Sequence, residues 1–444
     1  MNCLSACKGA GWRWLLPLVV VAGGCGVPAS ESADRSEPGE YSVHYVIAPD
    51  PVAATVRVAM HLRQGGGSLR ELSFSTSRIV DAVDGDGRIE AANGRVTWQP
   101  PERGGSLHWE VAISHERGNA GFDAFLGADW GVFRMEDAIP RARTRTLKGT
   151  VSRTTMDVAV PDGWSFVSEY PTLERPIVVD RPERRFDQPT GWVAVGRLGV
   201  RRDTIAGTRV AVAAPEGHGV RRLEMLALLS WTLPELDEIL PGALPRLTIA
   251  SAGEPMWRGG LSAPASLFLH ADRPLISENA TSPLLHEVMH VALGLRTAAG
   301  FDWIGEGLAE YYSIELLRRG RAITPERALA AFERQADWAK RADTLCGRAS
   351  TGATTARAVT LFAELDEALV AASDGAAGLD DLLPVLAGSR ADLATLTRAV
   401  HELVGETPDL LHIDNLPGCR STAADRPDRC NGACTNAAIP ADLT

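Results

Sequence analysis

Two histidines lie four positions apart in the segment TSPLLHEVMHVALG, residues 281–294, and a glutamate directly follows the first. Positions i and i+4 of an α-helix lie on one face, one turn apart, so His286 and His290 can direct two imidazoles at one metal ion. Glu287 lies about 100° further around the helix. In this H-E-x-x-H pattern the histidines bind zinc and the glutamate is the general base. The segment must therefore form a helix whose polar side chains face a common site.

The residues around the motif supply helix start and stop signals. Ser282 is a favoured N-cap residue, Pro283 is favoured at the first helical position, and Gly294 is suited to end the helix. We therefore expect a helix of about three turns. Its other side chains are almost all apolar, which predicts that it is buried. The alternative is a pair of core histidines that are hydrogen-bonded to their neighbours.

A third metal ligand is predicted in FDWIGEGLAEYY, residues 301–312, where Glu306 lies sixteen positions after the second histidine. Two histidines, a carboxylate and a water form the open tetrahedral site of a catalytic zinc. Gly305 and Gly307 flank this glutamate and would let the second helix approach the first closely. Glu310, one turn later, is expected to accept a hydrogen bond from a ligand histidine. The alternative is that Glu310 is itself the ligand.

Length and charge set broader limits. A chain of 444 residues is long enough for two or three domains, and 45% hydrophobic with 23% charged residues is typical of globular protein. The net charge of -11 argues against non-specific nucleic-acid binding, which depends on clustered lysine and arginine. We therefore expect no nucleic-acid partner.

The first 25 residues predict a signal peptide. Two basic residues precede the apolar run WLLPLVVVAGGC, which is too short to span a bilayer. The sequence AGGC, ending at Cys25, resembles a bacterial lipoprotein cleavage box, which implies an exported, cell-envelope protein that faces the periplasm or exterior. Its only membrane contact would then be a lipidated Cys25. The alternative is simple secretion. Residues 26–40 are polar and read as a flexible tether.

Four cysteines remain once Cys25 and the signal cysteines are set aside, and an even number in an exported protein suggests two disulfides. Three connectivities are possible. We expect that they pin the Cys-containing tail, residues 416–444, to the helical body. A zinc site is the less favoured alternative because no C-x-x-C pair occurs. The four are Cys346, Cys419, Cys430 and Cys434.

The hydrophobic pattern divides the chain into three regions. Residues 41–205 are short alternating runs between turn signals, which predict a β-sandwich-like domain. Residues 206–320 combine strands and helices and contain the histidine motif. Residues 321–415 are rich in alanine and leucine and predict packed helices.

The motif HEVMH, followed by WIGEGLAEYY at residues 303–312, resembles the gluzincin metallopeptidases, in particular the aminopeptidase N and glycyl aminopeptidase group. The resemblance implies a multidomain α+β fold, with an N-terminal all-β sandwich-like domain, a thermolysin-like catalytic domain and a C-terminal helical region. It also implies one Zn²⁺ per chain and hydrolysis of a peptide or protein substrate. An edge strand beside the metal would bind substrate backbone, and SLFLHAD, residues 266–272, is the candidate. The implied roles are metal binding for His286, His290 and Glu306, and general base for Glu287.

The chain departs from that group at two functional positions. The group binds the free amine of its substrate with a glutamate, but the corresponding stretch, residues 259–264, is GGLSAP and has no acid. The group also stabilises the oxyanion with a downstream tyrosine, whereas no tyrosine follows Tyr312. His401 and His412 are candidate replacements, although both are more simply read as ordinary residues. The departures motivate an alternative function, a non-catalytic envelope lipoprotein that keeps the peptidase fold as a binding or assembly module.

Overall fold

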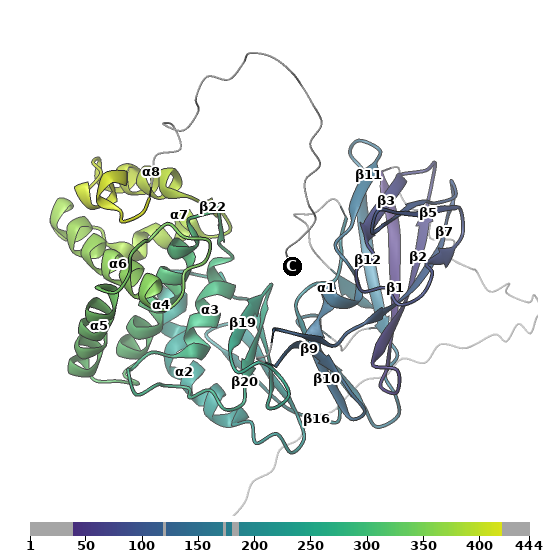
Figure 1. Cartoon of the computed structure of the whole chain (residues 1–444), viewed down its shortest axis with the longest axis horizontal. Helices are drawn as coiled ribbons and strands as arrows, with labels where there is room; N and C mark the ends of the chain where they lie inside the picture. The colour runs from purple at the N-terminus through teal and green to yellow at the C-terminus, as the bar shows by residue number, and fades with distance from the viewer. Residues whose placement is uncertain (1–38, 119–120, 172–174, 180–185, 420–444) are drawn as a thin grey trace, which may run out of the picture. The chain divides into compact units, whose positions relative to one another are not determined.

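The computed structural model describes residues 39–118, 121–171, 175–179 and 186–419 (Figure 1). Strand β1 illustrates why the first of these regions forms sheets. Its buried and half-buried residues alternate along its length, so one face packs against a core. The six-stranded sheet that contains it has the order β14 (Ile177–Val179), β12 (Val151–Val158), β1 (Glu40–Asp50), β2 (Thr55–Gln64), β7 (Gly104–Ala112), β4 (Asp84–Gly85).

Two further sheets complete the N-terminal β-rich region. One hydrophobic cluster takes residues from both the six-stranded and the four-stranded sheet, so their inner faces share a core. The four-stranded sheet has the order β11 (Arg143–Thr146), β3 (Leu69–Ser75), β6 (Arg95–Gln99), β5 (Arg88–Ala92). A five-stranded sheet has the order β13 (Ser165–Val167), β15 (Trp192–Gly196), β10 (Trp130–Arg134), β9 (Phe122–Leu126), β8 (His115–Glu116), and the short helix α1 (Met135–Ala138) follows β10.

A mixed five-stranded sheet opens the second half. Its order is β16 (Leu198–Ile205), β17 (Thr208–Pro215), β18 (Arg246–Ala252), β20 (Ser266–His270), β19 (Gly260–Ala263), with helix α2 (Arg222–Ile239) between β17 and β18. The central strands are parallel, whereas the outer strands β16 and β19 are antiparallel to their neighbours. Strand β16 falls inside the range assigned to the first β domain from the sequence. It joins this sheet instead because Ala206 and Gly207, both with positive φ, turn the chain back onto β17.

The prediction that residues 266–272 contain the edge strand is wrong. Residues 266–270 form β20, which pairs on both sides, with β18 and with β19. The free edge belongs to β19, because the turn at Pro264 and Ala265 folds the GLSA segment back along β20. The segment GGLSAP, residues 259–264, contains no acid, and it therefore includes the strand at the edge of the sheet.

Helices fill the rest of the described chain and share the largest hydrophobic core with one face of this sheet. Figure 1 shows them in green to yellow. They are α3 (Pro283–Leu293), α4 (Asp302–Arg319), α5 (Pro325–Ala339), α6 (Ala353–Ala372), α7 (Leu383–Leu386) and α8 (Leu393–Val404), with short 3-10 turns η1 (Leu379–Leu382), η2 (Asp409–Leu411) and η3 (Ile413–Asn415) and the strand pair β21 (Arg296–Thr297) and β22 (Arg390–Ala391).

The predicted bounds of the motif helix are confirmed. The Ser282 Oγ accepts a hydrogen bond from the Leu285 amide at 3.2 Å, and Pro283 begins α3. The helix ends at Gly294, whose φ of 53° lies in the left-handed region that favours glycine. Local capping chemistry therefore places both histidines on a helix of known start and end.

The chain has the multidomain α+β fold with an N-terminal β-rich region that the sequence predicts. Among the described residues, no helix combines the length and the apolar character that crossing a bilayer requires. Cys346 and Cys419 lie at disulfide distance, with Cα atoms 4.9 Å apart. This pair ties the segment before α6 to the residues that follow η3. Cys430 and Cys434 lie outside the described residues, so a second disulfide stays a prediction.

The expectation that Gly305 and Gly307 let α4 approach α3 closely is wrong. A Cβ on Gly307 would lie 2.6 Å from the Cβ of Ala358 and 2.9 Å from the Phe362 ring, so this glycine permits close packing of α4 on α6, not on α3. A Cβ on Gly305 would lie at ordinary distances from its neighbours, 3.5 Å from Thr297 Cγ2 and 4.0 Å from Leu295 Cδ2. The two glycines lie on different faces of α4, because residues two positions apart in a helix are about 200° apart around its axis.

We expect Gly307→Ala to lower the free energy of unfolding by about 1–3 kcal/mol, because the added methyl overpacks the α4–α6 contact. Gly305→Ala is the matched control. It should be neutral or slightly stabilising, since alanine is the better helix former by about 1 kcal/mol. Urea denaturation of both variants measures the difference. Equal stability of the two variants would contradict the packing assigned to Gly307.

Candidate metal centre

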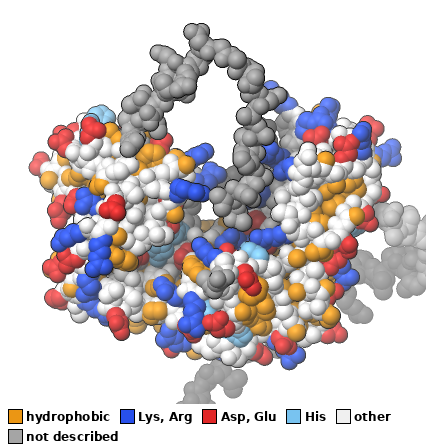
Figure 2. Space-filling view, viewed as in Figure 1, with side chains coloured by type: hydrophobic (Ala, Val, Ile, Leu, Met, Phe, Trp, Pro, Cys, Tyr) orange, Lys and Arg blue, Asp and Glu red, His pale blue; other side chains and the backbone are white. Residues whose placement is uncertain are grey.

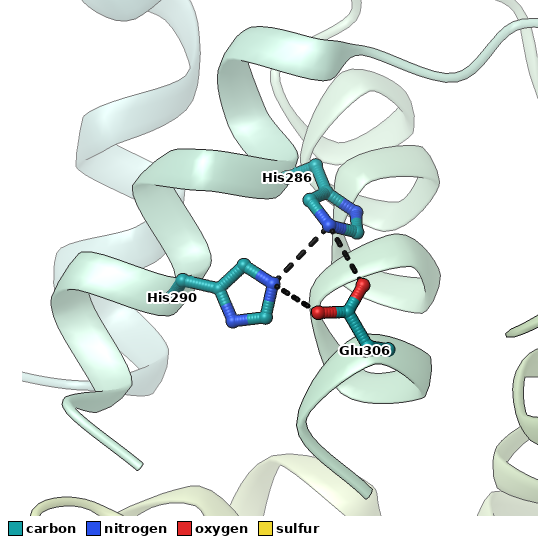
Figure 3. Close-up of side chains that lie close together, drawn as sticks. All are labelled: His286, His290 and Glu306. Atoms are coloured by element: carbon teal, nitrogen blue, oxygen red, sulfur yellow. Dashed lines mark hydrogen bonds and ion pairs between the residues drawn. The ribbon is translucent and has the colours of Figure 1, made fainter. Parts of the chain in front are cut away.

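Three predicted ligand side chains converge from α3 and α4 (Figure 3). The Nε2 atoms of His286 and His290 are 3.2 Å apart. Each also lies 3.4 Å from one oxygen of the Glu306 carboxylate. Ligand atoms that are each about 2.0–2.1 Å from a tetrahedral zinc are about 3.3 Å from one another. The spacing and the donor types of these residues therefore fit zinc.

The second nitrogen of His286 is held by Glu310. Its Nδ1 lies 3.0 Å from Oε2 of Glu310, and Gln335 donates a hydrogen bond to the other oxygen of that carboxylate at 3.3 Å. A carboxylate on Nδ1 orients the ring and leaves Nε2 free to bind a metal. The geometry therefore favours Glu306 over Glu310 as the third ligand.

The charges around the histidines favour a cation between them. Burial by itself raises the pKa of the Glu306 carboxyl. Its contacts with His286 and His290 lower that pKa by more than burial raises it, to about 2. Burial lowers the pKa of His286, but Glu306 and Glu310 outweigh this effect and raise it to about 10. The carboxylates thus stabilise positive charge at this point, whether it is carried by a proton or by a metal, and the two compete.

Glu287 is buried against the edge strand, with 8% of its surface exposed. Burial raises the pKa of its carboxyl, and this exceeds the lowering by the two histidines and by a hydrogen bond with Ser262. A Cβ on Gly260 would lie 2.8 Å from Oε1 of Glu287. A side chain at that position of β19 would therefore displace the carboxylate, and only glycine leaves room for it.

A cavity of about 660 Å³ contains all four predicted site residues. The edge strand, α3, α4 and the segment 349–351 line it, and no tyrosine lines it among the described residues. His401 and His412 do not replace that tyrosine. They line a separate cavity of about 820 Å³ beside α8, because the C-terminal helical turns fold away from the metal centre.

Sequence reasoning missed the arginines of this cavity. Arg117, Arg258 and Arg273 all line it, and Arg117 comes from the N-terminal β-rich region. The guanidinium of Arg117 lies 4.1 Å from the centre of the Trp257 ring, and the Phe122 amide donates to the Pro255 carbonyl at 3.0 Å nearby. No sequence signal could join them, because they come from loops that only the folded chain brings together.

In this chain a mixed sheet precedes a helix with His286 and His290 and a helix with Glu306. Two solved structures share this fold. One is an aminopeptidase N family protein from Idiomarina loihiensis, with 15% identity over 85% of this chain and 76% of that chain, and a TM-score of 0.65.

The other is a mutant of an M1 zinc metallopeptidase from Deinococcus radiodurans, with 16% identity over 87% of this chain and 96% of that chain, and a TM-score of 0.53. No protein-family model matches the sequence, and no curated protein matches it significantly. Identities this low show the fold alone. The predicted resemblance to the aminopeptidase N-like group is confirmed at that level.

We expect Glu310→Gln to weaken zinc binding about 10- to 100-fold without abolishing it, because the charged partner of the His286 Nδ1 is lost. Competition with a chromogenic chelator measures the zinc dissociation constant. Glu333→Gln, at an exposed position of α5, is the control and should bind zinc as the unaltered chain does. Complete loss of zinc in Glu310→Gln would instead identify Glu310 as a ligand.

Proposed function

We propose that the protein is an exported zinc-dependent metallopeptidase that hydrolyses peptide bonds. The observation that carries the proposal is the convergence of His286, His290 and Glu306 beside the buried Glu287, within one cavity. The similarity of the fold to an M1 zinc metallopeptidase supports the same reading.

The chain's own residues suit this reaction. Zinc bound by the two histidines and Glu306 would supply a water of lowered pKa and polarise the substrate carbonyl. Glu287 would be the general base that accepts a proton from the attacking water and the acid that donates it to the leaving amine. Burial raises the pKa of the Glu287 carboxyl, which makes it a better proton acceptor than an exposed carboxylate. The free edge of β19 offers backbone groups that pair with an extended peptide.

The location of the protein is a further part of the proposal. The signal segment and Cys25 lie outside the described residues, and the motivation for export is the sequence alone. We propose attachment to a membrane only through a lipidated Cys25, with the metal centre facing the periplasm or exterior. Membrane fractionation of the full chain and of Cys25→Ser tests this, and the variant should move to the soluble fraction.

Incubation of the purified, zinc-loaded protein with a diverse peptide library tests the activity. Mass spectrometry should find new termini that a zinc chelator prevents and added zinc restores. Zinc binding without any cleavage would instead favour the non-catalytic binding or assembly module. That alternative is considered because no tyrosine among the described residues lines the cavity.

A further inference from the structure

We propose that the metal cavity binds peptides with an acidic side chain close to the scissile bond, and that Arg273 is the specificity-determining residue that recognises it. The inference rests on the proposed peptidase function and names its substrate class. It follows from which charges in the cavity already have partners and which do not.

Each acidic side chain that lines the cavity already has a role. Glu306 and Glu310 contact the histidines, and Glu287 is buried between them and the edge strand. The carboxylate of Asp302 accepts a hydrogen bond from the Ser350 amide at 2.9 Å. No lining acid in the described chain is therefore left to bind a substrate cation such as a free amine.

The basic side chains are in the opposite situation. Arg273 is exposed, and across the described ranges its guanidinium has no hydrogen bond or ion pair. Arg258 has partial partners, with Glu254 at 2.9 Å and Asp272 at 3.5 Å. The cavity thus has an unpaired positive charge on its wall, and an arginine fork is suited to bind a carboxylate through two parallel hydrogen bonds.

Backbone pairing places this charge beside the edge strand. The His270 amide donates to the Gly259 carbonyl at 2.9 Å, and the Arg273 amide donates to the His270 carbonyl at 3.0 Å. Arg258 and Arg273 are therefore at the same end of the β19–β20 hairpin, where β19 begins. A peptide that pairs with the edge of β19 would bring a nearby side chain to these two arginines.

A second cavity of about 410 Å³ extends the basic character. It shares Thr281 and Glu310 with the metal cavity, and Arg334 and Arg341 of the α5 region line it. Its other acid, Asp337, is paired with Lys340 at 2.7 Å. Figure 2 shows Lys and Arg side chains in blue and Asp and Glu side chains in red, both spread over the face in view. In a chain of net charge -11, the arginines that line the two cavities favour an acidic peptide that extends beyond a single residue.

Matched fluorogenic peptides that differ only by Glu or Gln at each position flanking the cleaved bond test the inference. We expect the zinc-loaded protein to prefer the Glu peptide about two- to fivefold in kcat/KM at one or two positions, since a solvent-exposed charge pair contributes modestly. Arg273→Gln should bring this ratio close to one. Arg70→Gln removes an exposed arginine on β3, outside the cavity, and should keep the full ratio.

Binding to the Glu287→Gln protein separates this inference from the peptidase function. Fluorescence anisotropy with a labelled ten-residue peptide containing three Glu, against the same peptide with three Gln, should show tighter binding of the acidic form. Added salt and Arg273→Gln should each weaken that preference. Hydrolysis without charge preference would overturn the inference and leave the peptidase function standing. Charge-selective binding without hydrolysis by the unaltered protein would do the reverse.

Discussion

Replacement of Glu287 by glutamine is expected to lower the rate of peptide hydrolysis by about 10²- to 10⁴-fold, the usual contribution of a positioned general acid or base. The amide fills the same buried space beside Gly260 but cannot take a proton from the attacking water. The three ligand side chains are untouched, so the variant should keep its zinc.

Initial rates on a library-derived peptide and metal analysis of the same samples measure this prediction. Glu102→Gln changes an exposed glutamate of the N-terminal β-rich region and should retain both activity and zinc. Hydrolysis at the unaltered rate by Glu287→Gln would remove this residue from the mechanism. Loss of zinc along with activity would mean that Glu287 supports the metal centre itself.

Replacement of His290 by alanine is expected to abolish both zinc binding and hydrolysis. The unaltered chain should hold about one zinc, whereas the variant keeps only one histidine and Glu306 and should hold close to none. Elemental analysis after zinc reconstitution and dialysis measures the content. Circular dichroism checks that α3 is still folded.

His412→Ala is the matched control, because this histidine lines the separate cavity beside α8 and should not affect zinc content. Removal of zinc with a chelator should abolish hydrolysis by the unaltered chain, and added zinc should restore it. If the unaltered chain binds no zinc after reconstitution, the two histidines serve packing, and the peptidase function falls with the metal site.

The start and end of α3 were predictable from the sequence because capping is local chemistry. Ser282, Pro283 and Gly294 act within one helical turn of their own positions, and the i and i+4 spacing sets the two histidines on one face. The grouping of Glu306 with them followed from a short loop between two predicted helices. The structure brings the three side chains together.

The edge strand was not predictable in the same way. Both β20 and β19 are short and apolar, and only their pairing partners show that β20 is internal and β19 is free. Gly307 is similar, because its neighbours Ala358 and Phe362 lie more than fifty positions away along the chain. Such assignments depend on contacts between distant segments, which periodicity does not report.

The sequence by itself therefore determined the H-E-x-x-H pattern, the bounds of the helix that carries it and the fold class, since each depends on spacing within a turn or on the pattern of a whole region. Only the tertiary structure decided which strand borders the site, which histidines lie outside it and which arginines line it. Arg117, Arg258 and Arg273 become neighbours of the metal centre through loop packing, and no spacing in the sequence encodes that proximity.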